Sequence, residues 1–562
     1  MSVKLYSDKI RAQRPYTCKQ PNMNILTINL SLAKNLREMG HNLLQCDPPP
    51  GAVLDAAALC RKSGFNPDCM IQQETLGKRV LVLNMDPVPC PSVYWSIDTH
   101  LNTYWQRYYG LNFDLFLSTQ KKWAFELLRQ GIKNTAWLPW YGSEQKWLPW
   151  EKRKHDISFV GRITEARLAR KWMAEFLRDN FVPHIVQDIP FKAMLQTYAN
   201  TRLVPNEAIF GEVNFRTFEA ASCGAMVLSQ KLEDGLDSLF DPGREIITYE
   251  NVVELKGLVE YYLAHPKQAK TIAAAGRERV QKEHLPQHRA HTLSGLVQDL
   301  CRERRLKPDI YAWVSSLWLQ ENSLTGEKRE CSRALNSLSV TPETLLFRIQ
   351  NASRRNGDVL HYLVPILKQG QFDFHLLFNT GCSFAALQAG QFKLAKAFLL
   401  RHLRDRKPYM PDLADQGGLV RAWVRELVRA GEKLRPGFFY RPELHLPQSA
   451  VECLIWWHDK HPGNRSLLAD IKNLLGDIPG CEPVVLEALS RLSLHRQKDW
   501  RYNLELARIN LKAFRLRQGL EELVLAKKNA AESGAEHCLR SCLRRMDKNG
   551  LLRTALDEVT HA

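Results

Sequence analysis

Gly211-Glu-Val-Asn-Phe-Arg-Thr-Phe-Glu-Ala-Ala-Ser-Cys-Gly-Ala-Met-Val-Leu-Ser229 is the stretch of this sequence that decides the fold. Its first part has a helical pattern, stops at Cys223-Gly224 and leads into an apolar run over residues 225–229. A glycine just past a helix end is a left-handed cap, and a short apolar run after it predicts a parallel-sheet strand. Arg216 and Glu219 stand in this otherwise apolar helix. Because charges on an apolar element are costly without a partner, we expect both to be presented to a polar ligand.

Apolar runs alternate with helical patterns in two segments, residues 22–145 and 146–303, after an N-terminal extension over 1–21. In the first segment we expect strands at 24–29, 43–46, 68–71, 92–96, 113–118 and 135–138, and helices at 31–39, 53–62 and 121–130. In the second we expect strands at 156–162, 182–186, 201–205, 225–229 and 246–249, and helices at 165–178, 191–199, 252–265, 266–283 and 284–301. This alternation, with glycines at helix ends, predicts an α/β fold of two Rossmann-like, doubly wound sheets joined by a polar linker. The absence of a G-x-G-x-x-G loop weakens a dinucleotide-binding interpretation.

Strand signals stop near residue 304, and helical periodicity continues beyond it, interrupted by Leu434-Arg-Pro-Gly437 and Gly476-Asp-Ile-Pro-Gly480. Residues 387–395 have the spacing of a tetratricopeptide-type hairpin turn, and residues 503–530 predict another helical hairpin with Gly519 in its turn. The sequence therefore predicts an all-α domain over 304–562. It is either a repeat-like array that binds a partner protein or an irregular helical domain.

Length and composition bound the class of protein. A chain of 562 residues is too long for one core, and 44% apolar with 25% charged residues is ordinary for a soluble globular protein. No window of 18 uninterrupted apolar residues occurs and the first residues lack the apolar core of a signal peptide, so we expect no transmembrane segment and a cytoplasmic location. The thirteen cysteines are scattered, and Cys538 and Cys542 have no histidines at zinc spacing. We therefore expect reduced thiols and no metal site.

The formal net charge of +18 is concentrated late in the chain, in segments such as 301–307 and 401–407. Arginines interleaved with acids on helix faces are mostly solvated surface. No RNA-stacking motif or zinc finger accompanies them, so nucleic acid is not an expected partner. The charge suits attraction to anionic donors, acidic glycans or lipid head groups in peripheral membrane contact.

Phe218-Glu-Ala-Ala-Ser-Cys-Gly224 resembles the donor-binding segment of group 1 glycosyltransferases with the GT-B fold, and Asn214-x-Arg216-x-x-Glu219 resembles their CgeB-like branch. The resemblance implies that Glu219 accepts hydrogen bonds from both ribose hydroxyls of a nucleotide, since one ionised carboxylate offers two acceptor oxygens to a diol. It assigns Asn214 and Arg216 to the donor sugar or diphosphate, and Gly224 to a strand start close to the ligand. The alternative for the two charges is a salt bridge between Arg216 and Glu219, one turn apart.

The same family carries a second glutamate eight positions before Glu219, where this chain has Gly211, with Glu212 one position later. Ser158-Phe-Val-Gly-Arg162 resembles the first strand and phosphate loop of the donor domain. Gly161 would let the backbone approach the diphosphate, Arg162 would pair with phosphate oxygens, and a helix starting near Thr164 would add N–H donors. The family's lysine after this loop is missing, and Arg167 or Lys171 would substitute for it.

Trp95-Ser-Ile-Asp-Thr-His100 follows a predicted strand of the first segment, and open parallel sheets bind ligands at such carboxyl ends. Asp98 or His100 would accept the acceptor hydroxyl proton or position the donor. The alternative is capping of the next helix by Asp98 or Thr99. Pro139-Trp-Tyr-Gly142 is expected to line the cleft, where its aromatic rings would stack on a base or sugar or pack in the core.

The resemblance implies a metal-independent glycosyltransferase, hexosyltransferase-like and retaining as most group 1 members are, that moves a sugar from a nucleoside-diphosphate sugar to a glycan or protein. No cofactor beyond this donor is expected. Two other classes stay open. One is a non-catalytic scaffold that combines a degenerate transferase module with a helical protein-binding array, and the other is a sugar-nucleotide epimerase.

Overall fold

The computed structural model describes residues 22–300 and 340–561, apart from 133, 233–234, 355–357, 405–412, 462–463 and 548–549. The extension 1–21, the basic segment 301–307 and part of 401–407 lie outside the described residues. The described residues form two compact units. The first takes its residues from Met1–Thr119, Trp123–Leu138 and Leu293–Leu467, and the second from Gln120–Lys122, Pro139–Thr292 and Leu468–Ala562. Each unit holds one main parallel sheet and a share of the helical region.

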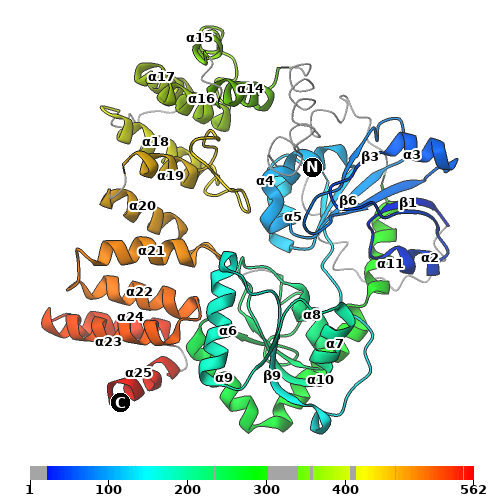
Figure 1. Ribbon diagram of the computed structural model, residues 1–562, viewed down its shortest axis with the longest axis vertical. Helices are drawn as coiled ribbons and strands as arrows, with labels where there is room; N and C mark the ends of the chain where they lie inside the picture. The colour runs from blue at the N-terminus through cyan, green and yellow to red at the C-terminus, as the bar shows by residue number, and fades with distance from the viewer. Residues whose placement is uncertain are drawn as a thin grey trace. The chain divides into compact units, whose positions relative to one another are not determined.

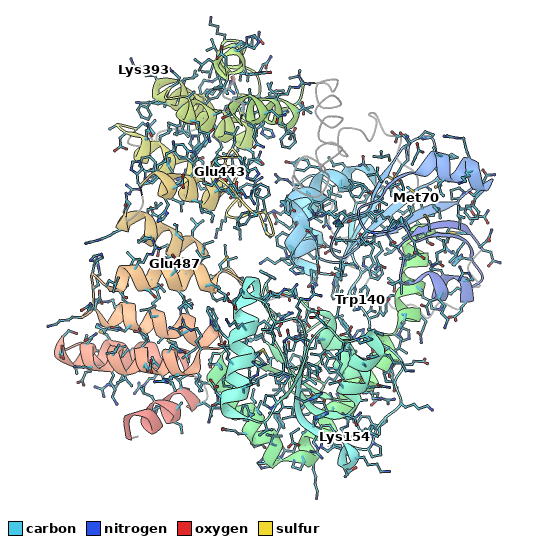
Figure 2. All side chains as sticks on the ribbon, viewed as in Figure 1. Met70, Trp140, Lys154, Lys393, Glu443 and Glu487 are labelled. Atoms are coloured by element: carbon cyan, nitrogen blue, oxygen red, sulfur yellow. The ribbon has the colours of Figure 1, made fainter. Side chains whose placement is uncertain are left out.

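Six parallel strands form the main sheet of the first unit among the described residues, in the order β2-β1-β4-β6-β7-β8. They are β1 Asn24–Ile28, β2 Asn42–Cys46, β4 Cys69–Gln73, β6 Ser92–Ser96, β7 Leu115–Ser118 and β8 Thr135–Trp137. The strand order reverses between β1 and β4, which defines a doubly wound sheet. Met70 lies on β4 and is buried in the core beneath the helices (Figure 2).

The helices that accompany this sheet are α2 Ala33–Glu38, α3 Ala56–Ser63, α4 Thr99–Tyr109 and α5 Lys121–Arg129, with a 3-10 turn η1 at Gly110–Asn112. The predicted helix over 53–62 is wrong in its first turn. Val53–Asp55 is a short strand, β3, that pairs in parallel with β5 Leu81–Leu83. Asp55 then begins α3 by accepting from the amide of Ala58 at 2.7 Å, which is the usual role of an N-cap aspartate.

Five parallel strands form the sheet of the second unit among the described residues, in the order β10-β9-β11-β12-β13. They are β9 His155–Val160, β10 His184–Val186, β11 Thr201–Asn206, β12 Met226–Gln230 and β13 Ile247–Tyr249. Helices α6 Leu168–Asn180 and α9 Val252–Ala264 cover one face, and α7 Phe191–Ala199, α8 Phe215–Ser222 and α10 Pro266–Glu283 cover the other (Figure 1). Short 3-10 turns, η2 Trp150–Lys152 and η3 Glu165–Arg167, precede β9 and α6. The strand order reverses between β9 and β11, so the ligand-binding crevice of such a sheet lies at their carboxyl ends.

Helix α11 Pro286–Gln298 crosses from the second unit to the first. In its last part, Ser294 Oγ lies 3.0 Å from Nε2 of His41. The predicted helix over 284–301 is therefore confirmed, and its end packs on the first sheet's unit.

Over the described residues, the helical region consists of successive helices and contains no strand (Figure 1). They are α14 Pro342–Arg354, α15 Leu360–Lys368, α16 Leu376–Gln388, α17 Phe392–Leu403, α18 Gln416–Arg429, α19 Ala450–Lys460, α20 Arg465–Leu475, α21 Glu482–Ser493, α22 Trp500–Lys512, α23 Leu516–Glu532, α24 Glu536–Met546 and α25 Leu551–His561. Among the described residues, none of the helices is sufficiently long and apolar to cross a bilayer.

Both predicted hairpins exist, as α16–α17 and α22–α23. The role expected for Gly519 is wrong. It lies inside α23, where a Cβ would press on the side chain of Leu511, and the turn is made by residues before α23, including Phe514 at φ +64°. The glycine therefore allows close approach of the two helices instead of a tight turn.

Helices α22, α23 and α25 are part of the core of the second sheet. Ala507, Leu523 and Leu552 share one buried cluster with Phe176 of α6 and Leu255 of α9. The end of the helical region is thus built into the second unit, while α14–α19 belong to the first.

Candidate functional site

Helix α8 carries Arg216 and Glu219. It begins near the carboxyl ends of β9 and β11, between which the strand order of the second sheet reverses, and this place is called the reversal point below. The helix begins after Asn214, whose backbone is extended, and its residues Phe218 and Ala221 are buried. The helix ends at Cys223, and Gly224 has the left-handed φ of +69°. The predicted helix, cap and strand are confirmed. Because α8 follows β11, its first turn stands at the carboxyl ends of the strands.

The guanidinium of Arg216 is buried and bridges the carboxyl ends of β9 and β11. Its Nε and Nη2 donate to the carbonyl of Val160 at 3.2 and 3.1 Å, and Nη1 donates to Asn206 Oδ1 at 2.8 Å. Nη1 also donates to Oε2 of Glu207 at 2.6 Å. The alternative of a salt bridge to Glu219 is wrong, because Glu207 holds the arginine from the end of β11.

Glu207 binds a second arginine, Arg170 of α6, through its other oxygen at 2.5 Å. The Glu207 side chain is fully buried, and those of Arg170 and Arg216 are 11% and 8% exposed. Burial lowers the pKa of Arg170, and the Glu207 charge opposes that shift. Two guanidinium groups share one carboxylate, so the cluster of Arg170, Glu207 and Arg216 carries one excess positive charge. Such a charge favours an anionic ligand.

Gly161 lies between these two arginines. A Cβ there would stand 2.9 Å from Nη2 of Arg216 and 3.5 Å from Nη1 of Arg170. Its own amide donates to the carbonyl of Val186 at 3.1 Å. The glycine thus makes room for the guanidinium groups, and its N–H is engaged in the sheet.

Glu219 lies on α8 one turn after Arg216, and its side chain is partly buried. Within the part of the chain that the structure describes, its carboxylate has no hydrogen bond or salt bridge. Burial raises its pKa to about 7, and the charge of Arg216 opposes this shift. A carboxylate held in this way is costly to the fold, and such residues concentrate at functional sites.

Glu212 is a second buried carboxylate in the loop between β11 and α8. Its Oε2 accepts from the amide of Phe210 at 2.8 Å. Burial raises its pKa to about 7, and the hydrogen bonds of the loop oppose this. Asn214 donates from Nδ2 to the carbonyl of Glu207 at 2.7 Å, while its Oδ1 is buried without a partner among the described residues.

Arg162 lies outside this cluster. It is 68% exposed and pairs with Asp188 at 2.9 Å, so the structure places it on the surface beside the reversal point. Lys171, one expected substitute for the missing lysine, pairs with Glu165. Arg167, the other, is exposed. The basic side chain that α6 supplies is Arg170.

Gly224 lies at the amino end of β12, on the opposite edge of the sheet. A Cβ there would overlap the indole of Trp147 and stand 3.1 Å from Nη2 of Arg153. Arg153 in turn donates to the carbonyls of Thr201 and Cys223 at 2.6 and 3.1 Å. The expectation that Gly224 brings the strand close to a ligand is therefore wrong: the space is filled by the linker.

Asp98 lies where expected, after β6 and at the N-terminal boundary of α4, but its side chain makes no capping hydrogen bond to that helix. The backbone amides of Ile97 and Asp98 donate to Oε2 of Glu74 at 2.7 and 2.9 Å, and Nδ2 of Asn102 donates to Oε1 at 2.7 Å. Glu74 is buried directly after β4. It fixes the start of α4, and with it the position of Asp98.

His100 is a poor candidate for a base. Its side chain is 6% exposed, and burial lowers its pKa to about 3. A ring this weakly basic does not take a proton near neutral pH, so the catalytic role predicted for His100 is not supported by its surroundings.

A cavity of about 260 Å³ opens beside Asp98 in the first unit. Its lining combines acids, an amide, a guanidinium and small residues: Glu74, Thr75, Leu76, Gly77, Arg79, Asp98, Leu101, Asn102 and Gly437. Arg79 donates to Asn102 at 2.8 Å and lies over the ring of Trp105. This mixture suits a ligand with hydroxyl groups.

Trp140, labelled in Figure 2, belongs to the second unit and stacks between two other rings. Its ring centroid lies 4.5 Å from that of Tyr141 and 4.4 Å from that of Phe215. Phe215 is the first residue of α8. The linker aromatics are therefore packed against the start of the site helix.

Three residues of the candidate sites were not predicted from the sequence: Glu207, Arg170 and Glu74. Glu207 and Glu74 each follow an apolar strand directly, and this position at the carboxyl end of a parallel strand was the available signal. Arg170 gave none, because helix α6 carries several basic residues at neighbouring positions. Among the described residues, no group of three or more metal-ligating side chains is present.

The geometry thus defines a doubly wound α/β protein with a polar site at the reversal point of its second sheet, where Arg170 and Arg216 share the carboxylate of Glu207. Residues 141–295, which include the whole of this site, match the family model described as Glycosyl transferase-like. No curated protein sequence matches the chain at a significant level.

The chain is similar to solved structures whose titles name a bound uridine nucleotide, a sugar-phosphate synthase or a sugar transferase. Anabaena HepE in complex with UDP and glucose aligns at 12% identity and a TM-score of 0.35, over 50% of this chain and 100% of that one. Sucrose-phosphate synthase from Thermosynechococcus elongatus aligns at 12% identity and 0.33, over 49% and 98%. The pneumococcal O-GlcNAc transferase GtfA, in complex with UDP and GlcNAc, aligns at 11% and 0.32, over 43% and 59%. TM-scores this low do not strengthen the match to the family model.

Proposed function

We propose that the chain is a glycosyltransferase that moves a sugar from a nucleoside-diphosphate sugar to a glycan or protein acceptor. The observation that carries the proposal is the pair Arg216 and Glu219 on α8. Arg216 belongs to a buried cluster with an excess positive charge, and Glu219, one turn away, is a partly buried carboxylate that has no partner among the described residues. A diphosphate and a ribose diol are ligand groups whose chemistry matches these two side chains.

The diphosphate would lie against the reversal point. Arg170 and Arg216 are both engaged by Glu207, so they would act through their net charge more than through free N–H groups. As the bond to the sugar breaks, negative charge grows on the departing diphosphate, and a fixed positive charge offsets it without reorganisation. In this proposal protein cations replace a metal ion, and no further cofactor takes part.

Glu219 would accept the ribose hydroxyls once it is ionised. Asn214 has a buried carbonyl oxygen without a partner among the described residues, which suits a hydroxyl donor from the sugar. Glu212 is the nearest equivalent of the family's second glutamate and would face the sugar. Retention of configuration and transfer of a hexose are the finer parts of the proposal.

The acceptor would use the cavity beside Asp98, which lies at the carboxyl ends of β4 and β6. Asp98 would take up or orient the proton of the attacking hydroxyl. A partner protein on the helical region and a cytoplasmic location are kept as parts of the proposal.

Two assays test this function. The first is a thermal-shift screen of nucleoside-diphosphate sugars, because a ligand specific for the native state raises the melting temperature. The second follows product formation from the best binder with and without candidate acceptors. Binding with acceptor-dependent loss of the sugar supports transfer, and conversion of the donor into another nucleotide sugar without acceptor indicates an epimerase. Absence of any nucleotide binding would instead favour the scaffold.

A further inference from the structure

Two Pro-Gly loops of the helical region touch the ligand-binding edges of the two sheets, each within its own unit. One is the loop 476–481 between α20 and α21, and the other is the loop 432–438 between α18 and α19. Neither contact was expected, since the sequence shows these clusters only as interruptions between helices.

In the second unit, the loop 476–481 packs on the loop 207–213 between β11 and α8. Gly480 has φ +85°, and a Cβ on it would overlap the ring of Phe210 and stand 3.1 Å from the carbonyl of Ile209. From the other side, Gly211 has φ +74°, and its Cβ would stand 3.2 Å from Cγ of Pro479. Two left-handed glycines thus let the two backbones meet closely.

The loop 207–213 carries two of the three carboxylates of the donor-side site, Glu207 and Glu212, while Glu219 lies on α8. Glu207 at its start binds both arginines, and the amide of Phe210 donates to Glu212 at 2.8 Å. Its last residue, Val213, exchanges two hydrogen bonds with Gln120, at 3.0 and 3.1 Å. The ends of the loop are therefore tied by hydrogen bonds, and its middle rests on the helical region.

In the first unit, the loop 432–438 is held by Arg435, which donates to both oxygens of Glu452. Arg435 also lies 3.7 Å above the ring of Phe438, and Phe438 contacts Tyr104 of α4 at 5.4 Å between ring centroids. Gly437, at φ +74°, lies against the carbonyl of Leu101 with no room for a Cβ. It is also part of the wall of the cavity beside Asp98.

We propose that the helical region is a structural part of both ligand sites: its loop 476–481 fixes the donor-side loop 207–213, and its loop 432–438 forms a wall of the acceptor-side cavity. The inference rests on the proposed function, which identifies the ligand of the second unit as the donor and the ligand of the first unit as the acceptor. The ligands concerned are a nucleoside diphosphate at the first place and a hydroxyl-bearing group at the second. Pro479, Gly480 and Gly437 are positioning residues in this account.

Matched glycines make the test sharp. Gly480→Ala would add a Cβ against Phe210, whereas Gly534, at φ +67° in the same unit, has nothing within 4 Å of its Cβ position. Both substitutions strain the backbone alike, so their difference isolates the contact. In the first unit, Gly437→Ala is matched by Gly390→Ala, whose φ is +72° with nothing within 4 Å.

Amide hydrogen exchange of the full chain is the first readout, because it needs no ligand. Gly480→Ala should raise exchange at the Phe210 amide about tenfold over Gly534→Ala. Gly437→Ala should raise exchange at the amides of Leu101 and Asn102, which donate to the carbonyl of Asp98, over Gly390→Ala. Equal exchange within either matched pair would overturn that half of the proposal.

Calorimetry with UDP and with GDP is the second readout. Gly480→Ala should weaken the binding of whichever nucleotide the wild type binds by about tenfold, with Gly534→Ala unchanged. If Gly480→Ala exchanges its amide hydrogens faster in the loop 207–213 but binds the nucleotide as tightly as the wild type, the part of the proposal that concerns the donor site is overturned. If Gly480→Ala folds poorly, adding Phe210→Ala should restore the fold, because it removes the ring that the new Cβ overlaps. Hydrogen exchange of the loop 207–213 is then compared between this double variant and Phe210→Ala alone. If the screen of nucleoside-diphosphate sugars finds no binder for the wild type, the proposed function fails, while the exchange comparison still decides whether the helical loops hold the site loops.

Discussion

Arg216 donates to Glu207 at 2.6 Å, and both side chains are buried at the reversal point of the second sheet. Since Arg170 pairs with the same carboxylate, one buried negative charge compensates two buried guanidinium groups. Natural folds retain such clusters where the excess charge has a use. The arrangement accounts for the position of Gly161 and leaves Glu219 without a partner among the described residues.

Glu207→Gln should destabilise the fold. Removing the shared carboxylate leaves two buried guanidinium groups uncompensated, and the free energy of unfolding should fall by about 3 kcal/mol. Glu165→Gln is the control, since Glu165 is 80% exposed in its pair with Lys171 and such pairs contribute little. Denaturant titration of both variants checks this. Equal effects of the two substitutions would argue against the buried centre.

Gly161→Ala should weaken nucleotide binding without unfolding the protein. The new Cβ would stand 2.9 Å from Nη2 of Arg216, so the guanidinium must shift, and we expect about a tenfold loss of affinity. Gly257→Ala on α9 is the control, because neither glycine has a positive φ and a Cβ on Gly257 would meet only the side-chain carbons of Leu551, at 3.3 Å or more. Calorimetry with the best-binding nucleotide sugar measures the loss, and an affinity equal to that of the control would contradict the assigned position of the diphosphate.

Donor binding should depend on pH with a midpoint near 7. Burial raises the pKa of Glu219 to about 7, so the carboxylate becomes neutral as the pH falls through this value and no longer offers two charged acceptor oxygens to the diol. Affinity should then decrease by up to about tenfold for each further pH unit. Glu212 has a similarly raised pKa, so the assignment needs both single variants. Glu219→Gln should abolish the dependence, and Glu212→Gln should leave most of it; the reverse pattern would move the diol to Glu212.

Truncation after residue 300 should give an aggregating protein. Ala507, Leu523 and Leu552 cover α6 and α9 in the core of the second sheet, and their loss exposes a contiguous apolar face. Solubility and melting temperature test this. A stable truncated protein that still turns over donor would contradict this prediction and show that the sheets fold without the helical region.

Most helices and strands could be predicted from the sequence, because their apolar residues recur with a clear period and glycines follow the ends of several helices. The misread residues 53–55 form a three-residue strand, and so short an apolar run before a helix has no period of its own. Gly224 was identified as a helix cap, but its neighbour Trp147 comes from the linker, and such a contact has no local signal.

Candidate site residues were predictable where the backbone alone decides their position. Asn214, Arg216 and Glu219 follow from the helix that carries them, and Gly161 follows from its strand. Glu207 and Arg170 depend on which strand ends and helix faces meet in space, which a single sequence does not encode locally. The same holds for Gly480 and Gly437, whose contacts join residues far apart in the chain.

The most direct test is calorimetric titration of wild type and Glu219→Gln at pH 8 with the nucleoside-diphosphate sugar that stabilises the wild type most. The account predicts at least about a tenfold loss of affinity in the variant. It also predicts a fold more stable than the wild type by on the order of 2 kcal/mol at this pH, because a carboxylate with a raised pKa opposes folding once ionised. That gain should vanish near pH 4, where both side chains are neutral. Unchanged affinity of Glu219→Gln for the donor would contradict the central claim.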